Sequence, residues 1–265
     1  MSPNIARAIW GYRGFILGSV KREFEARYRN SLLGAAWTML QPLAMITVYT
    51  VVFSELMRAR LPGLDSPYAY STFLCAGLLT WGLFAEILQR GQSVFIENGN
   101  IIKKLNFPRI CLPAITVLNA LVNFCITFSI FLAFLLITDN LPGWVVLYTV
   151  PILIVQVAFA IGLSVIAGVL NVFFRDVGQF VGILLQFWFW FTPIVYSTAT
   201  LPASARTLIR FNPMTPLATA YQGIFVYKQV PIWHTIWPVA LLALALCALG
   251  LFLFRRHAGD MVDEL

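Results

Sequence analysis

Long apolar stretches divide this chain of 265 residues into six segments that contain no Asp, Glu, Lys or Arg. A helix of about 20 apolar residues crosses the ~30 Å hydrocarbon core of a bilayer, and every segment is at least that long. Lipid offers no partner for backbone N–H and C=O groups, so such a stretch must be helical or part of a closed barrel. The segments are 30–54, 66–85, 110–138, 140–174, 177–205 and 229–254.

The apolar runs are continuous, whereas the strands of an outer-membrane barrel alternate between apolar and polar residues. The pattern therefore predicts an all-α integral membrane protein with six transmembrane helices per protomer. Because the number of spans is even, both termini are expected on the same side of the membrane.

Composition supports a membrane protein and indicates its orientation. Hydrophobic residues make up 60% of the chain and charged residues 11%, whereas a soluble domain has about 25% charged residues. Six spans leave no room for a separate catalytic domain. Thirteen of the 18 Lys and Arg residues lie before the first segment, after the last, or in the loops after the second and fourth. The positive-inside rule places these in the cytoplasm, with both termini, so the net charge of +7 does not indicate nucleic-acid binding.

The two ends of the chain are polar enough to stay outside the bilayer core. Residues 1–30 are interpreted as an amphipathic helix in the cytoplasmic interface, and 257–265 as a cytoplasmic tail. Three glycines weaken the N-terminal helix and favour a break into two pieces. A solvated basic arm is the alternative. The apolar residues at helical spacing are Ile5, Ile9, Tyr12 and Ile16.

The cytoplasmic segment 97–107, ENGNIIKKLNF, begins with residues that favour a turn, among them Asn98. A short amphipathic helix follows, and such a helix between two spans suits the docking of a soluble partner. An ordinary surface loop is the alternative. Its apolar side comprises Ile101, Ile102, Leu105 and Phe107, and its exposed side Lys103 and Lys104.

Two charged residues stand at the end of the second segment. Glu86 and Arg90 are four residues apart and can pair along one helix face. A carboxylate inside a membrane is a candidate functional group. A structural ion pair and a role in transport both fit the pattern.

The region 197–228 is broken by Pro202, Pro213 and Pro216. Within it, the apolar run 217–226 is too short to cross a bilayer and suits a re-entrant or interfacial segment. Irregular backbone at this depth requires protein or a water-filled cavity around it. We expect a pair of short helices that dip back into the outer leaflet and form a candidate gate.

Aromatic residues are abundant, with 22 Phe, 9 Tyr and 8 Trp. They can stack on the C–H faces of sugars and bind without charge. Ordinary packing in the core or against lipid is the alternative interpretation. The candidate channel lining lies on the first and fifth segments and comprises Trp37, Tyr49, Phe53, Phe180, Phe187, Trp188 and Phe191.

Several motifs of catalysis are missing from the sequence. It contains no GxxxxGK[ST] phosphate loop, no HExxH and no Ser-His-Asp candidate set. The two histidines are isolated, and the four cysteines form no CxxC, so we expect no bound metal or cofactor. Charges inside the spans are nearly absent, which argues against an ion-coupled carrier. Energy for any transport must then come from a partner.

Five motifs occur in a fixed order along the chain. The first, RYRNSLLGAAWTMLQP, contains a basic-aromatic pair, Ser-x-Leu-Gly, Trp and Pro, at Arg27, Tyr28, Ser31, Leu33, Gly34, Trp37 and Pro42. The later ones are NGNIIKKLNFPRICLP (98–113), NVFFRD (171–176), FTPIVY (191–196) and NPMTPL (212–217). From about residue 20 to the end, the sequence resembles the permeases of type-2 ABC exporters. The most similar branch exports bacterial polysaccharides such as O-antigen, capsule or teichoic acid.

The resemblance implies a homodimer in the bacterial inner membrane, with 31–256 as the transmembrane domain. Two cytoplasmic ATP-binding subunits would use ATP and Mg and would contact the N-terminal segment and 97–107. The first and fifth spans of both copies would line a pore for a glycan on a polyprenyl-diphosphate lipid. Arg27 and Arg29 would meet that diphosphate at the inner mouth. The outer gate would include Tyr196, Pro213, Pro216 and Tyr221.

Other functions remain open at this point. A drug- or lipid-exporting permease of the same superfamily would need a smaller cavity. A membrane-embedded enzyme would need clustered acidic, His or Ser groups, which the sequence lacks. A passive channel would work without nucleotide.

Overall fold

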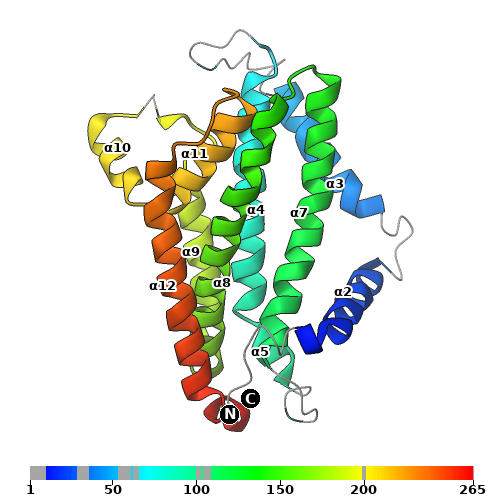
Figure 1. Cartoon of the computed structure of the whole chain (residues 1–265), viewed down its shortest axis with the longest axis vertical. Coiled ribbons are helices and arrows are strands. Elements are labelled where there is room, and N and C mark those ends of the chain that lie inside the picture. Colours follow the sequence, from blue (N-terminus) through cyan, green and yellow to red (C-terminus); the bar gives the residue numbers. More distant parts are fainter. Residues whose placement is uncertain are drawn as a thin grey trace.

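The computed structural model describes residues 10–28, 36–52, 61, 66–99, 103, 109–198 and 201–264. Among these residues the regular structure is entirely helical (Figure 1). We call the end of the bundle where α5 (Val94–Glu97) and α13 (Asp260–Glu264) lie the α5 end, and the opposite end, where α10 (Ala203–Arg210) lies, the α10 end.

Four helical stretches of the described chain are long and apolar enough to cross a membrane. They are α4 (Ala69–Gly91), α7 (Cys111–Ile137), the continuous pair η3 (Gly143–Tyr148) and α8 (Thr149–Phe173), and α12 (Trp233–His257). These correspond to the second, third, fourth and sixth segments expected from the sequence. The chain is therefore a multi-pass helical membrane protein.

Within the described residues, which exclude 29–35 and 53–60, the first and fifth expected spans correspond to shorter helices. α3 (Trp37–Tyr49) has 13 residues and α9 (Asp176–Phe191) has 16. At ~1.5 Å per residue they reach about 20 and 24 Å, less than the ~30 Å of a hydrocarbon core. α9 ends well before residue 205, because Thr192 precedes a proline and adopts an extended conformation. Four of the six expected spans are therefore long enough among the described residues, and the first and fifth spans remain a prediction.

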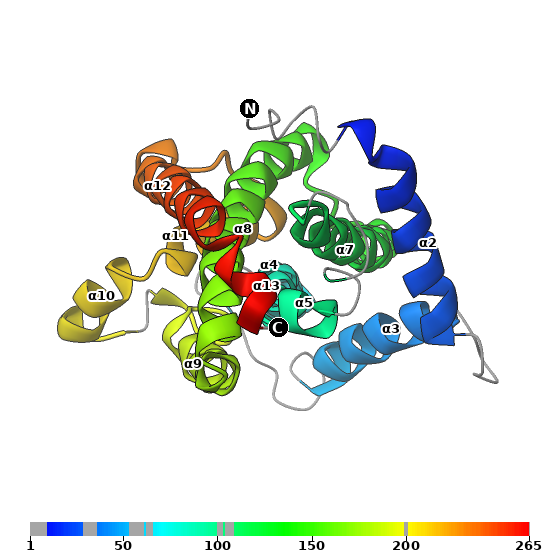
Figure 2. The same cartoon turned by 90° about the horizontal axis from the view of Figure 1, so that it is seen from below.

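The N-terminal helix α2 (Arg13–Tyr28) lies beside α7 (Figure 2) and near the α5 end (Figure 1). It is continuous through Gly14 and Gly18, but a turn at Tyr12, beside Gly11, separates it from the helical residues 10–11, so the N-terminal segment does break into two pieces. Its apolar side chains do not share one face, since Ile16 is buried while Leu17 is exposed.

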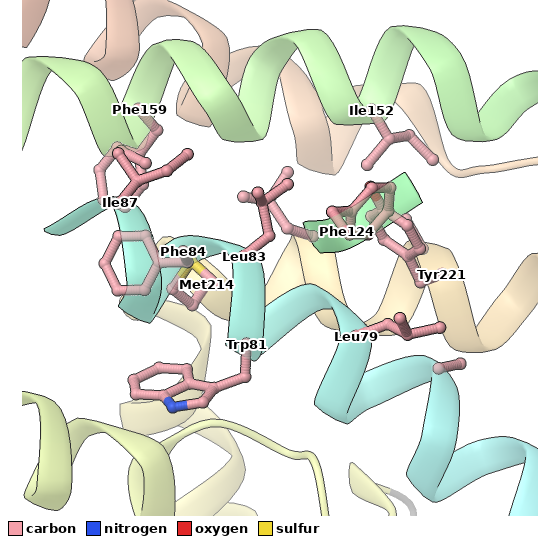
Figure 3. Close-up of a cluster of buried hydrophobic side chains, with 14 of the residues drawn as sticks. Leu79, Trp81, Leu83, Phe84, Ile87, Phe124, Ile152, Phe159, Met214 and Tyr221 are labelled. Carbon is pink, nitrogen blue, oxygen red and sulfur yellow. The ribbon is translucent and has the colours of Figure 1, made fainter. Parts of the chain in front are cut away.

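The region between α9 and α12 contains two short helices, as expected from its prolines. They are α10 and α11 (Met214–Phe225). α11 packs against α4, and its buried residues include Met214 and Tyr221, which belong to the central core (Figure 3). That these helices enter the outer leaflet stays a prediction.

α8 lies at the centre of the bundle and contacts α4 and α12 at very short range. A Cβ atom placed on Gly162 would lie 2.7 Å from the Cβ of Leu246 and 2.8 Å from the backbone nitrogen of Cys247. A Cβ on Gly168 would lie 2.8 Å from the carbonyl oxygen of Gly91. Small residues let membrane helices approach backbone to backbone. These glycines therefore fix α4, α8 and α12 as one closely packed unit.

Candidate functional site

The aromatic residues of α9 divide between two directions. Phe180, Phe187 and Phe191 are 62%, 62% and 53% exposed, and their spacing of seven and eleven residues places them on one helix face. Trp188 is half-buried and faces the core, where its ring lies 5.2 Å from that of Phe84. The described part of the chain thus leaves one aromatic face of α9 uncovered and uses Trp188 for internal packing.

The aromatic residues expected on the first span differ in their exposure. Trp37 is 51% exposed, and Tyr49 is half-buried beside α4, where its carbonyl oxygen accepts a 3.5 Å hydrogen bond from Ser71. Phe53 lies outside the described residues. In the view along the bundle, α3 and α9 flank the same side, with α4 set back between them (Figure 2). The two helices expected to line a channel therefore border one common face.

A single amide side chain joins the end of α9 to the start of α11. The Asn212 Oδ1 atom accepts hydrogen bonds from Trp188 Nε1 (2.7 Å) and from the backbone nitrogen of Met214 (2.9 Å). Its Nδ2 atom donates to the Phe191 carbonyl and to Thr192 Oγ1, both at 3.0 Å. An amide has two acceptor lone pairs and two donor hydrogens, and Asn212 uses all four.

The segment that follows α9 is held by the helices on both sides of it. Gln222 of α11 donates a 2.9 Å hydrogen bond to the Pro193 carbonyl, and Tyr70 of α4 donates a 2.6 Å bond to the Val195 carbonyl. Between them, Ile194 is fully buried, and its side chain lies 3.1 Å from where a Cβ on Gly77 would be. The chain therefore leaves α9 along a fixed path.

The expected gate residues occupy different environments around this segment. Tyr196 is half-buried, and its hydroxyl donates a 2.9 Å hydrogen bond to the Trp190 carbonyl. Pro213 caps α11, and Pro216 stands in its first turn, where the missing N–H costs nothing. Tyr221 is fully buried in the core rather than exposed at the α10 end.

Five polar side chains from three helices meet near the α5 end. Arg90 on α4 pairs with Glu86 at 3.4 Å and also with Glu23 on α2. On α7, Asn119 donates to Glu23, and Asn123 donates to Glu86 at 2.6 Å. The pair expected from i,i+4 spacing is therefore present as part of a larger cluster. Glu23 and the two asparagines had no sequence signal, because their partners are 37 to 96 residues away.

The residues expected at the inner mouth are only partly described. Arg27 lies on α2, close in sequence to Glu23, and Arg29 lies outside the described residues. The structure thus brings the helix that carries Arg27 into contact with α4 and α7 through Glu23.

The start of segment 97–107 is anchored in a hydrophobic cluster. Phe95 of α5 is fully buried, and its ring is stacked 5.6 Å from that of Phe254 on α12. The Asn98 side chain donates a 2.8 Å hydrogen bond to the Val94 carbonyl and so ends α5. Lys103 is exposed. Ile101, Lys104, Leu105 and Phe107 lie outside the described residues.

The motif NVFFRD contributes a junction at the same end. Asn171 of α8 donates hydrogen bonds to the Gln92 carbonyl (2.9 Å) and to Gln92 Oε1 (2.7 Å). Its own Oδ1 accepts a 3.0 Å bond from the backbone nitrogen of Gly178. One buried amide therefore ties the end of α4, the end of α8 and the first turn of α9 together.

These features define a helical membrane protein with one uncovered aromatic face and a polar junction at each end. The ABC-2 type transporter family matches residues 16–226, and the chain belongs to this family. It is a membrane component of such a transporter.

Curated relatives match along most of the chain. It is 32% identical over 265 residues to the O-antigen export system permease protein RfbA of Myxococcus xanthus, covering 99% of each protein. It is 32% identical over 206 residues to a Klebsiella pneumoniae protein of the same name, covering 77% of each. The polysialic acid transport protein KpsM of Escherichia coli is 21% identical over 253 residues, 92% of this chain and 93% of KpsM.

Proposed function

We propose that this chain is the membrane-spanning permease subunit of an ATP-driven ABC transporter that exports lipid-linked O-antigen across the bacterial inner membrane. The observation that carries the proposal is the similarity to the Myxococcus xanthus O-antigen export permease, which extends over 99% of both proteins. The exposed rings of Phe180, Phe187 and Phe191 support it, because they offer a glycan an uncharged surface.

The energy would come from partner subunits. In the proposed assembly, two copies of this chain bind two cytoplasmic ATPases that use ATP and Mg, and both termini lie in the cytoplasm. Segment 97–107 and α2 would contact the ATPases. Two linkages support this arrangement. Phe95 packs on Phe254 of α12, and Glu23 binds Arg90 of α4, so force on either contact reaches the spans.

The glycan would pass between the two copies, along α3 and α9. Arg27 and Arg29 would pair with the lipid diphosphate at the inner mouth, where guanidinium groups bind phosphate oxygens well. The outer gate would be the region around Tyr196, Pro213, Pro216 and Tyr221. The four hydrogen bonds of Asn212 support a gate that moves together with the end of α9.

Export can be tested by deleting the chain in its own bacterium. Cells should lose surface O-antigen, seen on gels of extracted lipopolysaccharide, and accumulate glycan on polyprenyl diphosphate inside. The chain supplied on a plasmid should restore export only with an active ATPase partner. Normal surface O-antigen in the deletion strain, or export with a hydrolysis-deficient partner, would contradict the proposal.

Capsule export is a second candidate, favoured by the similarity to the polysialic acid transport protein KpsM along 92% of this chain. The same deletion separates the two functions. Loss of capsule with intact O-antigen would assign the chain to capsule export. An unchanged surface with raised drug sensitivity would instead indicate a drug exporter.

A further inference from the structure

A cavity of about 600 Å³ lies between α3, α4 and α7. It is separate from the exposed aromatic face of α9, none of whose residues line it. On α4 its lining extends from Cys75 to Arg90, about 22 Å at ~1.5 Å per residue. The cavity is therefore long and narrow, and it exceeds the depth of one leaflet of a ~30 Å hydrocarbon core.

The lining changes from apolar to polar along this length. Aliphatic and aromatic side chains surround most of it, including Ile46, Leu79 and Phe131. Charged and amide groups gather toward the α5 end, where Glu86, Gln89, Arg90 and Asn123 line the wall. An occupant must therefore have one long apolar part and one polar head at the α5 end.

The charge at the polar end of the cavity indicates which lipid head group would bind there. Glu86 and Arg90 line the wall, and Arg90 also binds Glu23, which is not among the lining residues. Together these three side chains carry a net charge of about −1 at neutral pH. A diphosphate or a phosphatidylglycerol head would be repelled there. An ammonium group would be attracted, and a carboxylate is a strong acceptor for its N–H groups.

We propose that this cavity binds one acyl chain of an amine-bearing phospholipid, with the ammonium group at Glu86. On the proposed topology the α5 end faces the cytoplasm, so the lipid belongs to the cytoplasmic leaflet. The bound chain fills the space between α3 and the α4–α7 pair. The cavity shares Tyr49 of α3 with the expected channel lining, but the diphosphate of the exported lipid does not suit its polar end.

A substitution at Gly82 can block the cavity. Gly82 lines its middle, and a Cβ there would meet no atom within 4 Å. Gly82→Phe therefore places a ring in the cavity without a backbone clash. Gly223→Phe is the control, since a Cβ on the half-buried Gly223 also meets no atom within 4 Å, and Gly223 lies on α11, outside the cavity. If Gly82→Phe does not fold, Ile126→Trp fills the same space from α7.

The test uses the full chain in nanodiscs and measures the binding of spin-labelled phosphatidylethanolamine, phosphatidylcholine and phosphatidylglycerol. The unmodified chain and Gly223→Phe should bind phosphatidylethanolamine best and phosphatidylglycerol least. Gly82→Phe should weaken binding about tenfold, equivalent to ~1.4 kcal/mol. Glu86→Gln should reduce the preference for phosphatidylethanolamine over phosphatidylcholine by roughly fivefold, the scale of a partly exposed ion pair.

Three results would overturn the proposal. They are equal binding by Gly82→Phe and Gly223→Phe, a preference for phosphatidylglycerol, and stronger binding of a polyprenyl diphosphate than of any phospholipid. Because the readout is phospholipid binding, it does not depend on which glycan the transporter exports.

Discussion

The indole of Trp188 donates a 2.7 Å hydrogen bond to the side-chain oxygen of Asn212, across 24 residues of sequence. This bond turns one aromatic residue of α9 toward the core while its neighbour Phe187 stays exposed. It also places the start of α11 against the last turn of α9. The helix period sets the directions of these rings, and this polar contact helps to hold the end of α9 in the rotation that leaves Phe187 exposed.

Asn212 is expected to be the residue whose loss most disturbs this junction. Asn212→Leu removes four hydrogen bonds, and each buried group left without a partner costs about 1–3 kcal/mol. The variant should unfold at a clearly lower temperature in detergent. Asn212→Asp keeps the two acceptor contacts and should be intermediate. Equal melting of Asn212→Leu and the unmodified chain would show that the amide is dispensable.

Phe187 and Trp188 should respond oppositely to substitution. Phe187→Ala, alone or with Phe191→Ala, removes an exposed ring, so export should fall while the melting temperature barely changes. Trp188→Phe loses the hydrogen bond to Asn212 and should cost about 1–3 kcal/mol of stability. Surface O-antigen and thermal unfolding measure the two effects. Normal export by Phe187→Ala together with a lowered melting temperature would contradict this division of roles between Phe187 and Trp188.

The contact between Glu23 and Arg90 should be measurable as a coupling energy. A double-mutant cycle with Glu23→Ala and Arg90→Ala should give roughly 0.5–1 kcal/mol, because the pair is only partly exposed. The matched control is Lys21 with Glu25, an exposed pair at 3.8 Å, which should give nothing measurable. Equal coupling in both pairs would mean that Glu23 does not fasten α2 to the bundle.

Gly162 should tolerate no side chain. Gly162→Ala would push a methyl group into the backbone of α12 at Cys247, and overpacking of this kind costs about 1–3 kcal/mol. Gly182→Ala meets open space on α9 and should be neutral or stabilising by up to ~1 kcal/mol, because Ala favours helix. Thermal unfolding of both variants checks the contrast. A stabilised Gly162→Ala would refute the close approach of α8 and α12.

Lys103 and Lys104 are expected to act in coupling rather than in folding. Replacing both with Glu reverses the charge of segment 97–107 and should impair ATPase stimulation more than membrane insertion. Membrane fractions and ATPase rates of the assembled transporter give the two readouts. Normal glycan export by the Lys103→Glu, Lys104→Glu variant would count against docking at this segment.

The apolar pattern was sufficient to predict the long helices, because the bilayer sets their length. The ends of the helices are harder to predict from this pattern. The uncharged run continues to residue 205, but α9 ends at Phe191, because Pro193 forces Thr192 out of the helix. The orientation of Trp188 was not predictable, because Asn212 lies on another element. Of the cluster around Arg90, the sequence predicts only the pair with Glu86, because these two residues are four apart in one helix. Contacts between helices depend on packing that the sequence pattern does not contain.

The glycine contacts at Gly162 and Gly168 make one part of the bundle, α4, α8 and α12, more rigid than the part around α3. Where α8 meets α4 and α12 backbone to backbone, the helices are closely packed and resist relative movement. α3 instead borders the cavity of about 600 Å³ that separates it from α4 and α7, so it is less closely packed. If a pore opens along α3 and α9 as proposed, the strain should therefore fall on α3, while α4, α8 and α12 keep their positions.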